Sequence, residues 1–365
     1  MTTKFHRAAV AGAVLALGAV GLSACGANDT DSGGDSASGG GTTIALLLPE
    51  SKTTRYETFD KPLFEAKVAE LCSDCTVDYY NADQDAAKQT EQVATALNAG
   101  ADVLVLDPVN GPGATTMVDD ARAEGVPVIA YDRLITNADY YMSFDNETVG
   151  KLQAQALVDD LGDTGNILML NGSPDDPNAG QFKAGAHSVL DASGVTILEE
   201  YDNPDWSPEN AQKWTSDQLS KIDPADIDGV YAANDGQAGG VVAALTGAGV
   251  SADALPPITG QDAEIAALQR IISGEQAMTI YKSIKLEAET AAEVAVALVK
   301  GEDVPATTET GVTQTEYEGL KSYIFDPVVV TVDNIADSVI ADGFYSVDDI
   351  CTADFAAACE AAGIS

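Results

Sequence analysis

The stretch that decides the fold runs from Ala101 to Asp132 and reads ADVLVLDPVNGPGATTMVDDARAEGVPVIAYD. It begins with one short apolar run and ends with another, VPVIAYD, and residues 113–123 between them are predicted to form a helix. Continuous apolar runs are typical of strands that are covered by helices on both faces of a parallel sheet. A strand, a helix and a second strand in this order predict a right-handed βαβ unit.

The same alternation continues on both sides of this unit. On the N-terminal side we predict strands at 43–49 and 75–83 and helices at 58–71 and 86–99. On the C-terminal side, after a short segment at 140–146, the predicted strands are 166–170, 195–201, 228–235 and 256–262, and the predicted helices are 147–161, 178–190, 208–220, 238–248, 263–273 and 286–299. Residues 277–282 are predicted to be another extended segment, and residues 323–334 end the regular part. The sequence therefore predicts an α/β fold of two doubly wound parallel-sheet lobes.

The N-terminus is predicted to be a targeting segment. Lys4 and Arg7 precede an apolar run of about 15 residues, which is too short for a membrane span and suits the apolar core of a signal peptide. The run ends in Leu-Ser-Ala-Cys, which resembles the lipobox of bacterial lipoproteins. Residues 1–24 are then a lipoprotein signal peptide and Cys25 carries the lipid. The alternative is an ordinary signal peptide in which the cysteine occurs by chance.

Residues 25–42 are predicted to be a flexible tether, because they are rich in Gly, Ser and Asp and lack large apolar side chains. Four cysteines follow it, and they allow three pairings. In an exported protein the local disulfides Cys72–Cys75 and Cys351–Cys359 are our first choice. The C-x-x-C spacing of the first pair leaves a redox or zinc role open, but there is no second such motif, and the chain contains only His6 and His187.

The charge of the chain is strongly acidic, with 58 acidic against 18 basic side chains and a formal net charge of −40. Such a surface repels nucleic acid and anionic lipid, so we expect no nucleic-acid partner. We attribute the acidity to the solubility of an exported protein.

Polar side chains follow nearly every predicted strand. Ligands in open α/β sheets bind beyond the carboxyl ends of the strands, so these residues are expected to face one site. Their side chains combine hydrogen-bond donors and acceptors, which match the hydroxyl groups of a sugar, and an aromatic face such as Trp206 or Tyr56 suits the apolar side of a pyranose ring. Asp107 precedes a proline and is left out as a turn residue, and Asp235 is expected to cap the helix that follows it.

Sequence signatures of catalysis and of cofactor binding are missing. The chain has no dinucleotide-binding or phosphate-loop glycine motif and no G-x-S-x-G elbow. His187, in a predicted helix, reads as a surface or hydrogen-bonded helix histidine, not as part of a catalytic triad. Asp132 and Asp262 could be imagined as the carboxyl pair of a glycosidase, but Arg133 and Lys282 would keep both ionised. We therefore expect no enzyme activity, no catalytic residue, no metal ion and no cofactor.

Five segments together resemble the periplasmic monosaccharide-binding proteins of bacterial ABC transporters, a family with the type I periplasmic binding protein fold, and the D-xylose-binding members in particular. The segments are LPESKTTRYE (48–57), VIAYDRLI (128–135), NGSPDDPNA (171–179), AANDGQAGGVVAAL (232–245) and ITGQDAEIAALQRIISGEQAMTIYKSI (258–284). The resemblance covers residues 43–335. Two positions depart from it: Tyr56 stands where a tryptophan is usual, and Pro177 stands where an asparagine is usual. The first changes one aromatic wall, so glucose or another aldopyranose remains an alternative to xylose.

The resemblance implies nine sugar-binding residues. Trp206 stacks on the sugar ring, and the other eight form hydrogen bonds with the sugar: Arg55, Asp132, Arg133, Asp176, Asn178, Asn234, Asp262 and Lys282.

The resemblance also implies a three-segment hinge, with crossings near 142–146, 279–283 and 323–328. The N-terminal lobe is then residues 43–143 plus 282–324, and the C-terminal lobe is residues 144–281 plus 325–365. The implied function is that of a monomeric, lipid-anchored receptor on the outer face of the cytoplasmic membrane, which captures D-xylose or a related aldopyranose and delivers it to an ABC permease.

Two other functions compete with transport: ligand sensing, which uses this fold, and catalysis on sugars. A sugar-sensing repressor would need a DNA-binding helix pair where this chain has its signal segment, whereas a chemotaxis-type sensing role alongside transport stays open. An extracellular sugar enzyme would need an acid, a nucleophile or a metal site that the sequence does not show. The fold alone does not separate these functions.

Overall fold

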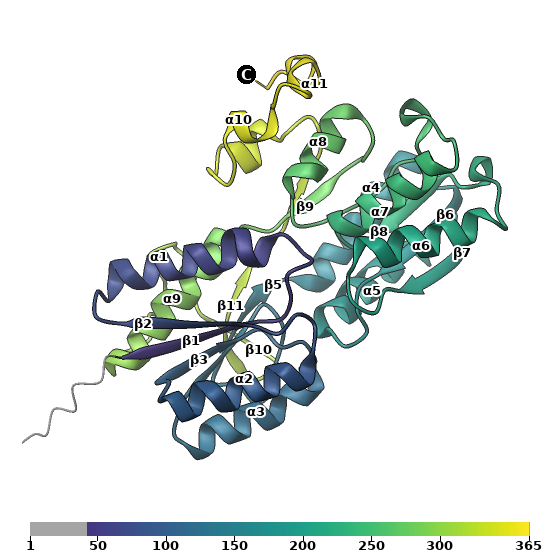
Figure 1. The fold of residues 1–365 in the computed structure, drawn as a ribbon. Coiled ribbons are helices and arrows are strands. Elements are labelled where there is room, and N and C mark those ends of the chain that lie inside the picture. The colour runs from purple at the N-terminus through teal and green to yellow at the C-terminus, as the bar shows by residue number, and fades with distance from the viewer. Residues whose placement is uncertain (1–41, 365) are drawn as a thin grey trace, which may run out of the picture. The chain divides into compact units, whose positions relative to one another are not determined.

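The computed structural model describes residues 42–364, and two sheets with their covering helices make up most of that range (Figure 1). The predictions for the signal peptide, for Cys25 and for nearly all of the tether lie outside the described residues.

The first lobe is built on a seven-stranded sheet with the order β10-β11-β5-β4-β3-β1-β2, which is parallel except for the β10–β11 hairpin. Its strands are β1 (Thr43–Leu48), β2 (Thr76–Asn81), β3 (Val103–Leu106), β4 (Val128–Tyr131), β5 (Tyr140–Phe144), β10 (Thr315–Tyr317) and β11 (Leu320–Phe325). Its helices are α1 (Lys61–Leu71), α2 (Ala86–Ala99), α3 (Gly111–Ala123) and α9 (Ile284–Lys300). A π-helical turn, η1 (Tyr56–Asp60), precedes α1.

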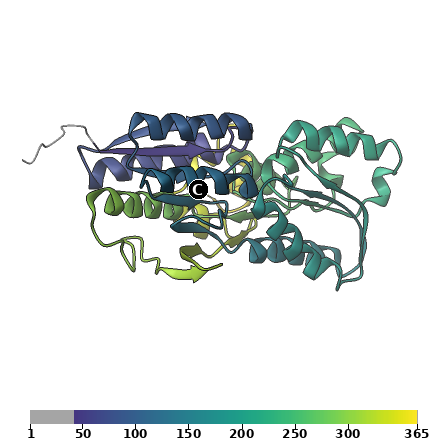
Figure 2. The same ribbon diagram turned by 90° about the horizontal axis from the view of Figure 1, so that it is seen from below.

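Strand β1 shows why this sheet is covered on both faces. Leu46 and its same-face neighbours pack against α1 and α9, whereas Leu47 packs against α2 and α3. Successive side chains of a strand point to opposite faces, so an unbroken apolar run needs two helical layers to bury it. The doubly wound arrangement predicted from such runs is confirmed. Figure 1 shows α1 on one side of the sheet and α2 and α3 on the other, and Figure 2 views the molecule from the side of α2 and α3.

The second lobe is built on the parallel sheet β7-β6-β8. Helices α4 and α5 cover one face, and α6 and α7 cover the other. The elements are α4 (Asn146–Leu161), β6 (Gly165–Asn171), α5 (Pro177–Leu190), β7 (Val195–Asp202), α6 (Pro208–Leu219), β8 (Gly229–Ala232), α7 (Asp235–Gly247), α8 (Ile265–Ser273) and the short 3-10 helices η2 (Pro224–Asp226) and η3 (Ala252–Ala254).

Three segments run from one lobe to the other. Strand β5 leads directly into α4, and two antiparallel strands, β9 (Thr279–Tyr281) and β12 (Val328–Val330), lie between the second lobe and the elements α9 and β11 of the first. Single bridges, Val230 to Ile258 and Gln261 to Ile280, connect β8 through residues 258–261 to β9.

The C-terminal part forms a small aromatic cluster on α8, β9 and β12. It contains the π-helical turn η4 (Ala336–Ile340), α10 (Val347–Ile350) and α11 (Ala356–Ala361). The Phe344 ring also stacks on Phe59 of η1, with 4.1 Å between the ring centroids, so this segment touches an element of the first lobe as well. Disulfides join Cys72 to Cys75 and Cys351 to Cys359, the local pairing.

Several predicted elements differ from the structure. Residues 256–262 make only the two isolated bridges, because Pro256 and Pro257 lack the N–H groups that a ladder requires. The helix predicted at 58–71 starts at Tyr56 with a π-helical turn, and the one predicted at 238–248 starts at Asp235. Strand β10 and the C-terminal helices were not predicted.

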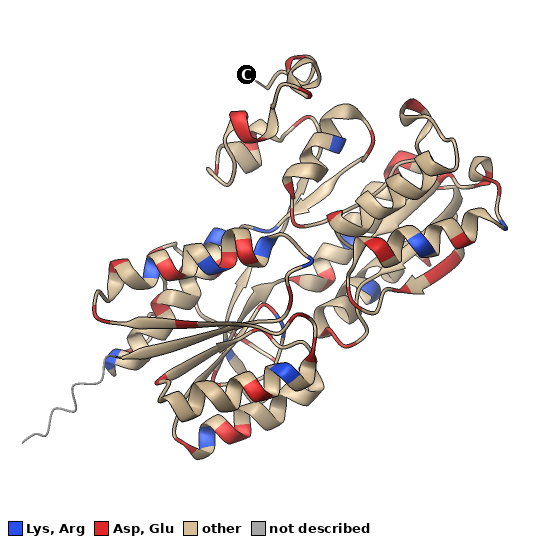
Figure 3. Ribbon diagram, viewed as in Figure 1, with Lys and Arg blue, Asp and Glu red and all other residues tan. Residues whose placement is uncertain are grey.

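The surface carries the acidic excess on both lobes, with Asp and Glu spread along the helices in Figure 3. Among the helices of residues 42–364, none combines the length and the apolar composition that a bilayer span needs.

Helices α4 and α5 approach so closely that two glycines are required at the contact. A Cβ atom on Gly150 would lie 1.9 Å from the Phe182 carbonyl oxygen, and one on Gly185 would lie 2.1 Å from that of Glu147. Backbone atoms cannot move aside as a flexible side chain can, so a methyl group at either position has to separate the helices.

We predict that Gly150→Ala lowers the free energy of unfolding by about 1–3 kcal/mol, measured by urea denaturation. The control is Gly180→Ala in α5, where a Cβ atom would meet nothing within 4 Å. That change removes only chain entropy from the unfolded state and should be neutral or stabilising by up to about 1 kcal/mol. Equal stability of Gly150→Ala and the unsubstituted protein would contradict the close packing.

Candidate functional site

All nine residues singled out in the sequence line one cavity, whose wall is formed by both lobes. Arg55, Asp132 and Arg133 come from the first lobe, and Asp176, Asn178, Trp206, Asn234 and Asp262 come from the second. Lys282 lies in the linking segment after β9. Four further residues line the cavity: Tyr56, which was considered above as an aromatic face, and Thr53, Phe182 and Gln261, which were not singled out in the sequence.

Most of these residues reach the cavity because they follow the carboxyl ends of parallel strands, whereas Lys282 follows β9, which pairs antiparallel with β12. Asp132 and Arg133 come directly after β4, and Asn234 comes two residues after β8. The backbone turns sharply at three of these strand ends: Asp132, Trp206 and Asp262 have φ values of 55°, 60° and 92°. Positive φ is uncommon for residues other than glycine and costs free energy, most clearly for a tryptophan. Such strain at three cavity residues is typical of a functional site.

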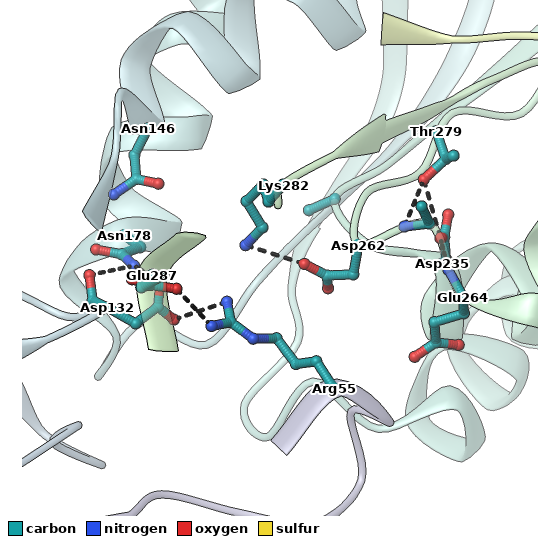
Figure 4. A network of polar contacts seen from close by, with 12 residues as sticks. Arg55, Asp132, Asn146, Asn178, Asp235, Asp262, Glu264, Thr279, Lys282 and Glu287 are labelled. Carbon is teal, nitrogen blue, oxygen red and sulfur yellow. Dashed lines mark hydrogen bonds and ion pairs between the residues drawn. The ribbon is translucent and has the colours of Figure 1, made fainter. Parts of the chain in front are cut away.

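Arg55 forms ion pairs with three carboxylates, two of which Figure 4 shows. Its Nε and Nη2 atoms donate to the two carboxylate oxygens of Asp60 at 3.0 and 2.7 Å, and Nη2 also donates to Glu287 Oε2 at 2.7 Å. Its remaining nitrogen, Nη1, forms only an ion pair with Asp132 at 3.3 Å and has no hydrogen-bond partner within residues 42–364. The guanidinium is therefore fixed from behind and keeps donor capacity near Asp132.

Arg133 joins the two lobes beside the cavity. Its Nε atom lies 2.9 Å from Asp176 Oδ2 and 3.4 Å from Asp107 Oδ1. Its Nη1 atom donates to the Pro108 carbonyl oxygen at 3.1 Å, and Nη2 donates to the Tyr56 hydroxyl at 3.3 Å. The planar guanidinium thus contacts groups from both walls in one fixed orientation.

Lys282 and Asp262 form a third buried ion pair, with 2.9 Å between Nζ and Oδ1. The Nζ atom also lies 5.6 Å from the centroid of the Phe144 ring and 5.7 Å from that of Phe182, within the range of a cation–π contact. The ammonium group therefore lies near two aromatic rings, one from each lobe.

The Trp206 ring is held in place by its neighbours. The indole Nε1 donates to Asp176 Oδ2 at 3.1 Å. A Cβ atom on Gly172 would lie 2.0 Å from the six-membered part of the indole, so the bare backbone of Gly172 makes room for the ring. Its edge-to-face contact with Phe182 completes an aromatic wall.

Two asparagines of the cavity lie at the N-terminal ends of helices. Asn178, in the first turn of α5, donates through Nδ2 to the Asp132 carbonyl oxygen at 3.1 Å, which joins the lobes. The Asn234 side chain accepts from the Gln237 N–H and is the N-cap of α7. The prediction that Asp235 caps this helix was wrong, because its carboxylate is buried and accepts instead from Gln276 and Thr279, as Figure 4 shows for Thr279.

The surroundings of the buried carboxyl groups shift their pKa values in different directions. Burial would raise the pKa of Asp132, but the positive charges of Arg55, Lys282 and Arg133 outweigh it and hold that pKa below its ordinary value. Burial raises the pKa of Asp107 well above its ordinary value, although Arg133 opposes the shift. Burial would lower the pKa of Lys282, but Asp262 and Asp132 raise it. Asp132 and Lys282, which both line the cavity, are therefore charged at neutral pH.

The site is equipped for recognition by hydrogen bonds. It combines fixed cationic donors, carboxylate and amide acceptors and an aromatic wall in a buried setting, where such bonds are stronger than in water. Within residues 42–364 no group of three or more His, Cys, Asp or Glu side chains is arranged to hold a metal ion. His187 lies on α5 away from the cavity lining, where it pairs with Asp191 and Glu200.

Sequence reasoning missed the residues behind the cavity. Asp107 was taken as a turn residue, yet it is fully buried next to Arg133, and its position at the end of β3 was the available signal. Asp60 and Glu287 lie on helical elements, at positions that no sequence motif marks. The bridge residue Gln261 sits beside Asp262 and has a buried Oε1 atom without a hydrogen-bond partner in the part of the chain described.

Comparison with known proteins agrees with this architecture. The model of the periplasmic binding protein domain family matches residues 44–303. The chain belongs to this family. Its members are binding proteins of ABC transporters and not enzymes, and the type I fold predicted from the sequence is confirmed.

Among curated proteins, the chain is 39% identical over 316 residues to the D-xylose-binding periplasmic protein of Escherichia coli K12, covering 84% of this chain and 92% of that protein. It is 35% identical over 289 residues to the multiple sugar-binding periplasmic receptor ChvE of Rhizobium radiobacter, covering 73% and 81%. Among solved structures, an ABC transporter solute-binding protein from Clostridium phytofermentans with bound β-D-glucose has a TM-score of 0.75 at 28% identity, covering 85% of this chain and all of that one.

Polar contacts also join the lobes outside the cavity. Lys52 forms an ion pair with Asp205, Asn110 Nδ2 donates to Asp175 Oδ1 at 2.9 Å, and the Thr54 N–H donates to Glu264 Oε1 at 3.2 Å. The Lys52–Asp205 pair is partly exposed, unlike the ion pairs of Arg55.

We predict that Arg55→Met lowers the free energy of unfolding by about 3–5 kcal/mol, because it leaves Asp60 and Asp132 buried without their guanidinium partner. Lys52→Met, which removes a partly exposed pair, should cost less than about 1 kcal/mol. Urea denaturation of both variants at neutral pH measures the difference. An equal loss of unfolding free energy in the two variants would contradict the claim that the buried ion pairs of Arg55 stabilise the fold more than the partly exposed pair of Lys52 does.

Proposed function

We propose that this protein is an extracytoplasmic, lipid-anchored receptor that captures a monosaccharide, most specifically D-xylose, and delivers it to an ABC permease. The observation that carries the proposal is the cavity itself. Its wall combines Arg55, Asp132, Asp262 and Lys282 with the aromatic face of Trp206, and both lobes contribute to it.

The chemistry of this wall suits an uncharged polyol. Each sugar hydroxyl is one donor and two acceptors, so it can accept from a guanidinium or ammonium group and donate to a carboxylate at the same time. The cationic and anionic side chains are already paired with each other, so the site offers directional hydrogen bonds without a large excess of one charge facing the ligand. In our proposal Trp206 supplies the apolar surface. Eight residues supply the hydrogen bonds: Arg55, Asp132, Arg133, Asp176, Asn178, Asn234, Asp262 and Lys282.

The choice of xylose is supported by the relative named for that sugar, which is 39% identical to this chain. Tyr56 stands where a tryptophan is usual in that resemblance, and its hydroxyl is occupied by Arg133. The relative named for multiple sugars and the neighbour with bound glucose favour glucose or another aldopyranose as the second candidate.

The anchor and the permease are inferred from the sequence and the family. Leu22 to Cys25 resembles a lipobox, and a Gly/Ser/Asp-rich tether follows it. A tethered receptor would keep its cleft close to a permease in the same membrane. A chemotaxis-type partner is a second role that the same cleft would support.

We predict that D-xylose raises the melting temperature of the protein in a thermal-shift panel of pentoses and hexoses. A ligand at a thousand times its Kd adds about 4 kcal/mol to the stability of the folded state. Stabilisation of that size raises the melting temperature by several degrees, at roughly 2 °C per kcal/mol in a chain of this size. Tryptophan fluorescence should change in the same titration through Trp206.

The matched controls are two substitutions of aspartate. Asp262→Asn, in the cavity, should abolish the sugar-induced shift, whereas Asp253→Asn, on the exposed helix η3, should leave it intact. The absence of a shift with every aldopyranose would refute the sugar receptor, and turnover of the sugar would refute a function limited to binding.

A further inference from the structure

Three carboxyl groups surround the single guanidinium of Arg55. Asp60, Asp132 and Glu287 all lie within 3.3 Å of an Arg55 nitrogen, and the most exposed of the four side chains is only 5% accessible. Figure 4 shows Asp132 and Glu287 beside the guanidinium. One positive charge cannot balance three negative charges in a dry environment, because each unbalanced charge carries a large desolvation cost.

The geometry shows which carboxylates have a cation. Asp60 receives two parallel bonds from Arg55, the strongest arrangement for such a pair, and it also accepts from the Tyr131 hydroxyl. Asp132 shares Arg55 but also faces the positive charges of Lys282 and Arg133. Glu287 has no cation of its own: Oε2 accepts from Arg55, and Oε1 has no hydrogen-bond partner in the described residues.

We propose that Glu287 keeps its proton at neutral pH and acts as a positioning residue, a neutral acceptor that holds Arg55 toward the cavity. The inference rests on the proposed function in that Arg55 is taken to bind the sugar. Glu287 does not line the cavity and lies one turn into α9, directly after the linking segment that carries Lys282. It therefore acts on the ligand only through Arg55.

The charged surroundings of Glu287 agree with a retained proton. Burial raises its pKa well above the ordinary value, the negative charge of Asp132 raises it further, and Arg55 lowers it. The titratable and charged groups that face it come from η1 and its N-cap residue, from β4 and the residue after it, from β5 and from the segment after β9: Arg55 and Asp60; Tyr131 and Asp132; Tyr141; and Lys282.

A neutral Glu287 has a clear consequence for Arg55. As a neutral acceptor it fixes Nη2 without competing for the positive charge, which stays shared between Asp60 and Asp132. An ionised Glu287 would repel Asp132 and draw the guanidinium back from the cavity. The proton on Glu287 would thus keep Nη1, the nitrogen without a hydrogen-bond partner, available to a ligand hydroxyl.

The first test uses stability and needs no ligand. A glutamate in the unfolded chain has a pKa of about 4.3, so above that pH a native Glu287 that keeps its proton binds more protons than the unfolded chain does. Folding stability contributed by this residue therefore falls as pH rises toward its native pKa. Glu287→Gln cannot titrate, so its melting temperature relative to that of the unsubstituted protein should increase steadily from pH 5 to pH 8.

The control is Glu289→Gln, a partly exposed residue of the same helix, whose difference from the unsubstituted protein should not change over this range. A Glu287→Gln difference that does not rise with pH would overturn the proposal, because a glutamate that is ionised in both the folded and the unfolded chain takes up no proton on folding and gives no rise over this range. The result depends on the slope with pH and not on how well the amide packs.

The second test uses sugar affinity measured by calorimetry. Glu287→Gln keeps an oxygen that accepts from Arg55, whereas Glu287→Leu does not, so the leucine variant should bind about tenfold more weakly than the glutamine variant at pH 7. The affinity of the unsubstituted protein should also fall at alkaline pH, where Glu287 ionises, and that of Glu287→Gln should not fall with it.

Equal affinities of the two variants would overturn the positioning role. If the unsubstituted protein binds no aldopyranose at all, the proposed function fails, and the slope of the stability difference still reports whether Glu287 holds its proton.

Discussion

The structure depends on balancing charges that are buried where the two lobes meet. Arg55, Arg133 and Lys282 are each at most 3% exposed, and each is paired with carboxylates. Since a buried charge without a partner costs several kcal/mol, these residues cannot be altered independently. The pairs across the lobes, such as Arg133 with Asp176, also bring the two walls of the cavity together. The charges therefore have a structural role as well as a recognition role.

The fold brings these charged residues together. Parallel strands deliver their carboxyl ends to one edge, and in both lobes that edge carries the polar residues. The left-handed backbone at Asp132, Trp206 and Asp262 turns these side chains into the cavity, and well-packed surroundings sustain the strain. A cavity divided between two lobes can surround a small ligand when the lobes approach, and hinge motion of this kind is a common way to enclose one.

Much of this could be predicted from sequence because the relevant signals are local. Apolar runs such as residues 44–48 identify strands buried on both faces, and polar residues directly after them identify the cavity edge. All nine singled-out residues line one cavity, although whether they bind a sugar stays a prediction. Residues 256–262 were predicted to form a strand but make only isolated bridges, because prolines within an apolar run weaken strand pairing. Asp60 and Glu287 were missed because their importance comes from Arg55, which is distant from Glu287 in sequence and adjacent in space.

The sequence also could not show which groups hold protons. Asp132 and Glu287 are both buried carboxyl groups beside Arg55, yet their pKa values shift in opposite directions because only Asp132 faces two further cations. This depends on distances of a few ångströms between residues from different elements.

The most direct test of the central claim is a crystal structure of the protein grown with D-xylose. The account predicts one pyranose in the cavity, with hydroxyl oxygens within hydrogen-bond distance of Arg55, Asp132 and Asp262 and with one ring face against Trp206. A structure at saturating xylose in which the cavity holds only water, or in which the sugar lies elsewhere, would contradict it.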